Sequence, residues 1–107
     1  MTVLDNFTFL SSQSSATEGN VLKNIHGESL TLGVTGSFVG SITVQGKQGG
    51  DWFDLTAVDL VNFNTHTAIT SEGSYAVVSP QGFTDIRCNL TAITEGSVTV
   101  TGRLCAG

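Results

Sequence analysis

The sequence predicts an all-β fold, an antiparallel β-sandwich or jelly-roll-like single domain, and three observations support this. Turn residues recur about every 8–12 residues, as they do between the short strands of sandwiches. Between the turns, apolar and polar residues alternate with the period of two that turns one side of a strand toward a core. Almost no stretch has helical spacing, and 107 residues of which 39% are hydrophobic fit one domain with a modest core.

The first twenty residues differ from the rest of the chain. Residues 2–10, "TVLDNFTFL", favour a strand, whereas residues 11–20, "SSQSSATEGN", are typical of a flexible linker or a long surface loop. We therefore expect residues 1–20 to form either an N-terminal arm or a first strand with a Ser-rich linker, and residues 21–107 to form the β-sandwich domain. An arm would dock on another subunit through its apolar side chains, which are Val3, Leu4, Phe7 and Phe9.

Alternation marks the strands that follow. The stretches "SLTLGVTG", "SFVGSITVQG", "SYAVVS", "FTDIRCNLTAI" and "SVTVTGRL" carry apolar residues mostly at every second position. Residues 56–73 break this pattern, which indicates a bulge, an edge strand or a crossover between sheets. The residues expected on core faces include Leu30, Leu32, Val34, Phe38, Ile42, Val44, Ile86, Cys88, Leu90, Ala92, Val98, Val100 and Leu104.

A glycine-serine pair precedes the start of a predicted strand three times, at Gly36, Gly73 and Gly96. Glycine tolerates the positive φ of tight turns, so the repeat indicates turn chemistry and not a repeat protein. The third copy, "ITEGSV", lies between two alternating stretches and is expected to be a short hairpin loop.

The two cysteines are not expected to form a disulfide. Cys88 shares the core face of its strand, whereas alternation from Val98 to Leu104 places Cys105 on the opposite face. We expect a buried thiol at Cys88 and a loose terminal thiol at Cys105, with a disulfide as the disfavoured alternative. Free thiols agree with synthesis in a reducing host cytoplasm.

The charge of the chain disfavours two classes of partner. The net charge is -5, and the four basic residues, Lys23, Lys47, Arg87 and Arg103, do not cluster. Nucleic-acid binding needs a basic stripe against the phosphates, and an anionic membrane would repel this chain. No apolar run approaches the roughly 20 residues of a membrane span, and the N-terminus lacks the basic start of a signal peptide.

Motifs that carry chemistry are missing from the sequence. His26 and His66 have no second ligand at metal-binding spacing, and no nucleophile, phosphate loop or calcium loop is found. Asp51, Asp54 and Asp59 are close in sequence, but a turn cap at Asp51 and solvated carboxylates are favoured over an oxygen-ligand site. We therefore expect no catalysis, no metal and no cofactor.

The single tryptophan follows a glycine-rich turn in "QGKQGGDWFDL", residues 45–55. Gly46, Gly49 and Gly50 favour a hairpin, and the Trp52 ring would pack back over it. A position in the core or under a loop is favoured, because Trp buries a large apolar area. The alternative is an exposed platform on which a sugar stacks.

The order of these features resembles small β-sandwich domains in virion proteins of tailed bacteriophages. The resemblance rests on "GSFVGSITVQGKQGGDWFDL" and "TSEGSYAVVSPQGFTDIRCNLTAITEGSVTVTGRL", and it covers residues 36–104. Such domains occur in capsid decoration proteins, head fibres and tail appendages. Residues 1–35 have no counterpart in this pattern.

The resemblance implies a virion structural protein that is made in the host cytoplasm. Because one domain fills nearly the whole sequence, a capsid decoration (cement) protein is the first hypothesis. It would bind the major capsid protein or other virion proteins, with Val3, Leu4, Phe7 and Phe9 as capsid or subunit contacts. A homotrimer would suit local threefold sites. The alternative is a carbohydrate- or receptor-binding module of a tail or head appendage, with Trp52 as the glycan contact.

Overall fold

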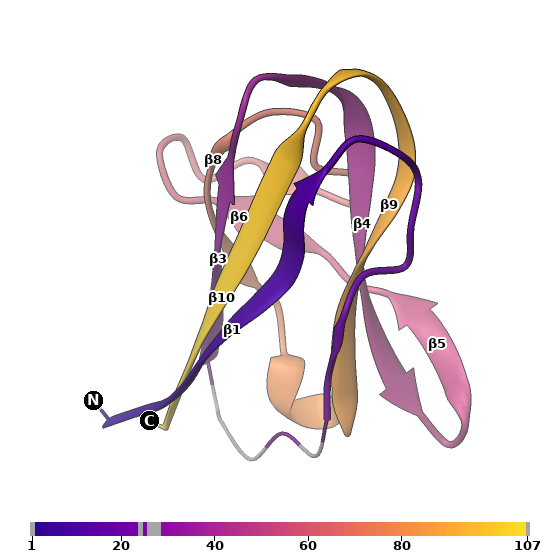
Figure 1. Ribbon diagram of the computed structural model, residues 1–107. Helices are drawn as coiled ribbons and strands as arrows, with labels where there is room; N and C mark the ends of the chain where they lie inside the picture. Colours follow the sequence, from indigo (N-terminus) through magenta and orange to yellow (C-terminus); the bar gives the residue numbers. More distant parts are fainter. Residues whose placement is uncertain (1, 24, 26–28, 107) are drawn as a thin grey trace.

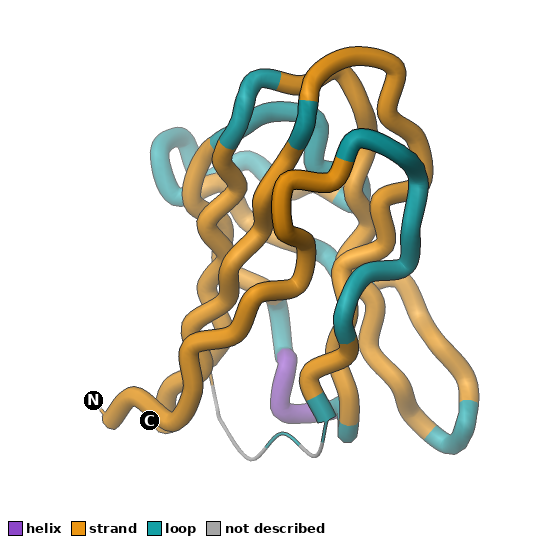
Figure 2. The backbone as a smooth tube through the Cα atoms, viewed as in Figure 1, coloured by secondary structure: helices purple, strands orange, loops and turns teal. Residues whose placement is uncertain are grey.

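The computed structural model describes residues 2–23, 25 and 29–106, and it shows two antiparallel sheets packed face to face (Figures 1 and 2). One sheet has six strands in the order β1-β10-β3-β8-β6-β7, and the other has four in the order β2-β9-β4-β5. The all-β, antiparallel, single-domain prediction is confirmed. A 3-10 turn at Pro80–Gly82 joins β8 to β9. The strands are β1 (Thr2–Gln13), β2 (Val21–Leu22), β3 (Ser29–Thr35), β4 (Phe38–Gln48), β5 (Asp51–Asp54), β6 (Ala57–Asp59), β7 (Thr65–His66), β8 (Gly73–Val77), β9 (Asp85–Gly96) and β10 (Val98–Ala106).

The core lies between the sheets and follows the alternation of the sequence. In β3, Leu30, Leu32 and Val34 are each 1% exposed, whereas the residues between them are not fully buried. Ile86, Cys88 and Leu90 of β9 are fully buried opposite them. No helix in the described part of the chain is long and apolar enough to cross a membrane.

The first strand belongs to the six-stranded sheet. β1 pairs antiparallel with β10 from Thr2↔Ala106 to Gln13↔Val98, with three irregularities. Beyond it, the backbone N–H of Asn20 donates to the carbonyl oxygen of Phe9 at 2.9 Å, so the return segment closes on β1. Residues 2–13 thus form a strand of the sandwich in this structure.

The turn at Gly96 is not a hairpin, because the strands on either side lie in different sheets. β9 pairs with β4, whereas β10 pairs with β1 and β3. The crossover from β3 to β4 at Gly36 is of the same kind. Gly36 and Gly96 have φ of 112° and 76°, and a Cβ on either would overlap the carbonyl of Ser97 or Ser37 in the other crossover. The prediction of glycine turns is confirmed, and the hairpin prediction is wrong.

A bulge in β9 overturns the placement of Ala92. Leu90 pairs with Ile42 and Ala92 pairs with Ser41, so Thr91 is an extra residue in the ladder. The extra residue shifts the alternation by one position. Ala92 is therefore exposed, and Ile93 packs against the core instead.

Residues 56–73, in which the alternation of apolar and polar residues breaks, contain the strands β6 and β7 at one edge of the six-stranded sheet. An edge strand was one of the expected causes of this break. β6 and β7 pair over two positions only, Ala57↔His66 and Val58↔Thr65. Further along, Ile69 makes an isolated bridge to Ile42 of β4 and is 1% exposed. This bridge joins the loop after β7 to the opposite sheet.

Both cysteines are free, as expected, but Cys105 is not a loose terminal thiol. It is 5% exposed, compared with 0% for Cys88. β10 is an inner strand at this point, with Val3 of β1 paired on one side of Cys105 and Ser29 of β3 on the other. Neighbours on both sides bury the thiol although alternation turns it away from the core.

Candidate functional site

The described residues contain no cluster of three or more His, Cys, Asp or Glu that could hold a metal ion. His66 is partly buried, with its ring edge-on to Tyr75 at 5.9 Å between centroids, and His26 lies outside the described residues. Asp51 and Asp54 are on β5, whereas Asp59 is in the other sheet. Two other surfaces of the described residues bring aromatic or polar side chains together.

The first surface is on the hairpin of β4 and β5, which extends past the other strands in Figure 1. Its turn contains Gly49 and Gly50, with φ of 64° and 92°, between the paired residues Gln48 and Asp51. Two successive positive φ values are typical of the tight hairpin turn that glycines favour. The hairpin predicted from the glycines is thus present.

Trp52 lies on the outer face of this hairpin, opposite Lys47. The Arg87 guanidinium stacks on the indole at 4.1 Å from the ring centroid, and the Lys47 Nζ is 5.9 Å from the centroid. Both distances are in the range of cation–π attraction. Trp52 is partly buried but is not part of the core, so the core position favoured from the sequence is wrong. The ring packs back over the hairpin beneath cationic side chains.

Polar groups hold Arg87 in place against this ring. Its Nε donates to Oε1 of Gln45 at 2.8 Å, and its Nη1 is 2.6 Å from Oε2 of Glu18. Gln45 Nε2 in turn donates to Oδ1 of Asp54 at 2.9 Å. The side chain of Arg87 is only 15% exposed, and its Nε and Nη1 both have partners, which hold the guanidinium in this position. We call these five residues, Glu18, Gln45, Trp52, Asp54 and Arg87, the hairpin cluster.

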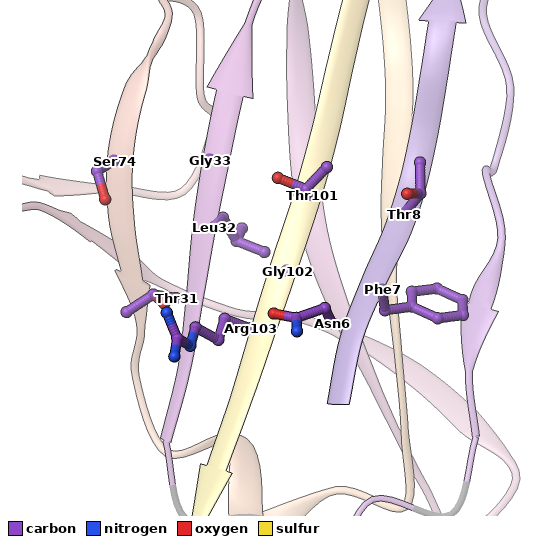
Figure 3. Close-up of a pocket in the computed structure, with 10 residues that line it drawn as sticks. All are labelled: Asn6, Phe7, Thr8, Thr31, Leu32, Gly33, Ser74, Thr101, Gly102 and Arg103. Carbon is purple, nitrogen blue, oxygen red and sulfur yellow. The ribbon is translucent and has the colours of Figure 1, made fainter. Parts of the chain in front are cut away.

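The second surface is a hollow of about 420 Å³ on the outer face of the six-stranded sheet, across β1, β10, β3 and β8 (Figure 3). Two register rows build it, Asn6↔Arg103↔Thr31 and Thr8↔Thr101↔Gly33↔Ser74. Gly33 leaves the space open, because a Cβ there would lie 3.3 Å from Oγ1 of Thr101.

The chemistry of this hollow is that of a polar donor surface. Figure 3 shows the Arg103 guanidinium reaching toward Thr31, while the ring of Phe7 points away. The lining residues offer hydroxyls, an amide and one guanidinium, and none of them carries a carboxylate. Such a set suits a polar or anionic group.

The four N-terminal contact residues have different environments. Val3 and Leu4 are exposed, at 38% and 46%. Phe7 is partly buried against the core, with its ring edge-on to Phe9 at 4.9 Å. Phe9 is fully buried, and its ring packs on Gly102, so it is a core residue and is not available as a contact. The sequence could not separate these four, because a bulge between Val3 and Asp5 interrupts the alternation.

The hollow and the partners of Trp52 were missed from the sequence. Outward threonines at alternate positions of two strands, "LTLG" and "VTVTG", are the available signal for the hollow. The stacking of Arg87 on Trp52 had no signal, since it depends on β9 and β5 lying on either side of β4.

Two solved structures, of the proteins YomS and XepA, share this fold. YomS, described as an SPBc2 prophage-derived protein, superposes with a TM-score of 0.83 at 22% identity, over 94% of this chain and 90% of YomS. XepA, described as a PBSX exported protein, superposes with a TM-score of 0.87 at 23% identity, over 94% of this chain. This chain spans 37% of the XepA chain. At these identities the likeness shows the fold alone.

No curated protein sequence matches the chain. The XepA family model, however, matches residues 4–104. Because this match covers almost the entire sequence, the chain belongs to the XepA family.

Proposed function

We propose that this chain is a structural protein of a bacteriophage particle, and that it decorates the assembled head. The observation that carries the proposal is the family match over residues 4–104, together with the solved neighbour YomS, which is described as a prophage-derived protein. The same fold makes up 90% of the YomS chain, so one sandwich of this kind can be nearly a whole protein.

The proposal gives the chain a binding role and no catalytic one. Its partners would be the major capsid protein or other virion proteins, and its location would be the virion after synthesis in the host cytoplasm. A net charge of -5, with only four basic residues in the sequence, supports a protein partner over nucleic acid or an anionic membrane. We propose closed symmetry for the assembly, with a homotrimer as the first state to test.

The test is co-sedimentation of the purified chain with heads prepared without it. Decoration predicts saturable binding to heads in a fixed ratio to the capsid subunits, and no binding to isolated tails. Binding to tails alone would overturn the decoration role. Light scattering behind a sizing column measures the mass in solution. If no concentration gives the mass of three chains, the trimer is excluded.

The hairpin cluster favours a second candidate, a carbohydrate- or receptor-binding module of a head or tail appendage. Gln45 and Asp54 offer planar hydrogen-bonding groups beside an outward-facing Trp52, the combination that sugar sites use. The Arg87 guanidinium covers part of the indole, so the apolar platform is smaller than that of a bare tryptophan.

Glycan-array screening of the wild type and of Trp52→Ala tests this second candidate. A glycan-binding module predicts a hit that the variant loses while its circular dichroism spectrum stays that of the folded chain. A hit that survives the substitution would place the glycan elsewhere on the molecule.

A further inference from the structure

The loop between β6 and β7 exposes apolar side chains that the fold does not use. Val61 is 83% exposed, Phe63 73% and Leu60 39%. All three lie within the six residues 59–64, which we call the apolar loop. Exposed apolar groups gathered in this way mark interaction sites more often than scattered ones do.

Hydrogen bonds hold the apolar loop in one shape. Phe63 N–H donates to the Asp59 carbonyl at 2.7 Å, and Asp59 N–H donates to the Asn64 carbonyl at 2.9 Å. The Asp59 carboxylate accepts from Val61 N–H at 2.8 Å, and Leu60 N–H donates to the Ser74 carbonyl of β8 at 3.0 Å. The apolar groups are therefore presented on an ordered support.

The backbone at Phe63 is strained. Its φ is 60°, in the left-handed region that costs an aromatic residue free energy and that Asn or Gly adopts more readily. In the isolated chain, an exposed ring at this position contributes no core packing to offset that cost. The sequence "VNFN" even has asparagine on both sides of the strained position. The fold of the isolated chain therefore gives no reason for a phenylalanine at this position.

Charge selects the kind of partner. The apolar loop itself contains one acidic residue, Asp59, and no Lys or Arg. Asp59 lies at the base of the loop, and exposed Glu72 is two residues before Ser74, which anchors Leu60. An anionic lipid surface lacks the complementary charge. A protein with an apolar recess and basic residues around it would accept the apolar side chains of the loop and attract its acidic neighbours.

We propose that the apolar loop is the element by which this chain docks on a protein partner, inserting Val61 and Phe63 into an apolar recess with a basic rim. The inference rests on the proposed function, in which that partner is a protein of the phage particle. Central apolar anchors of this kind carry most of the affinity of an interface.

The test compares two double variants in co-sedimentation with particles prepared without the chain. One is Val61→Ser with Phe63→Ser, and its control is Val39→Ser with Phe53→Ser, which removes a valine and a phenylalanine that are 55% and 47% exposed elsewhere. We expect the loop variant to bind about tenfold or more weakly and the control to bind like the wild type. High salt should weaken wild-type binding, because the rim contact is ionic.

A single substitution separates docking from folding. Phe63→Asn suits the left-handed backbone, so its thermal midpoint should equal or exceed that of the wild type while its binding to particles is lost. If both loop variants bind particles as well as the wild type does, the docking role of the loop is overturned, whereas the proposed role of the chain in the particle is not. Failure of the wild type to bind would overturn both.

Two further measurements test whether the loop binds a lipid surface or a second copy of the chain instead. Sedimentation with vesicles of phosphatidylcholine, alone or with phosphatidylserine, should show no binding. Light scattering of the wild type and the loop variant should give the same mass. Vesicle binding or self-association that depends on Phe63 would overturn the inference in favour of a lipid or a second copy.

Discussion

Replacing Gly96 with alanine should destabilise the chain more than the same change at Gly49. Both glycines have left-handed φ, 76° and 64°, and this conformation costs an alanine about 1–2 kcal/mol. The lower entropy of the unfolded chain returns roughly 0.4–1 kcal/mol. A Cβ at Gly49 meets nothing within 4 Å, so Gly49→Ala should lose about 1.6 kcal/mol at most.

At Gly96 the new Cβ enters a space that is already filled. It would overlap the backbone carbonyl of Ser37 and lie 3.1 Å from the Cα of Phe38, and backbone atoms cannot rotate away as a side chain can. Overpacking of this kind adds about 1–3 kcal/mol. Gly96→Ala should therefore lose about 1–3 kcal/mol more than Gly49→Ala, or about 1–5 kcal/mol in total.

Urea unfolding followed by Trp52 fluorescence measures both losses, since the chain has one tryptophan. Domains of this size are typically stable by about 5–15 kcal/mol, so the two variants should be clearly resolved. Gly36→Ala should behave like Gly96→Ala, because its Cβ would overlap the Ser97 carbonyl. Equal losses at Gly49 and Gly96 would refute the contact between the two crossovers.

Four other substitutions test the structure. Trp52→Ala should lower the unfolding free energy by about 1–3 kcal/mol by circular dichroism, because the ring packs on Arg87 outside the core; a loss above about 4 kcal/mol would place it in the core. Burial raises the pKa of Cys88, so its thiol stays neutral when folded, and stability should be constant below about pH 9 and fall above it. Cys88→Ala should remove this alkaline slope in urea titrations, and an unchanged slope would assign it to other groups. Ile93→Ala should cost about 1–2 kcal/mol while Ala92→Ser stays within about 0.5 kcal/mol; the reverse order would exclude the bulge.

Local pattern was enough to predict the strands and their buried faces. The alternation of Leu30, Leu32 and Val34 records which face meets the core, and this requires only neighbours along one strand. The glycine turn at Gly49 and Gly50 is equally local, because its backbone needs φ values that glycine supplies. Such features depend on a few successive residues and can be read from them.

Pairing between strands was not readable in the same way. The sequence around Gly96 is the same whether the strands on either side of the turn pair with each other or with strands in two sheets. The extra residue at Thr91 likewise has no local mark, and it moved Ala92 outward. The hairpin cluster could not be predicted for the same reason, since Arg87 reaches Trp52 only because β4 lies between their strands.

The antiparallel pairing of the first and last strands has a mechanical consequence. Thr2 pairs with Ala106, so the two ends of the sandwich lie together, as Figure 1 shows. A force that pulled these ends apart would open the β1–β10 ladder one pair at a time, like a zipper, and would never load all pairs in shear. Such a geometry yields at low force. Any assembly that moves its parts would therefore strain this chain least if the chain is held by one face and not pulled by its two ends.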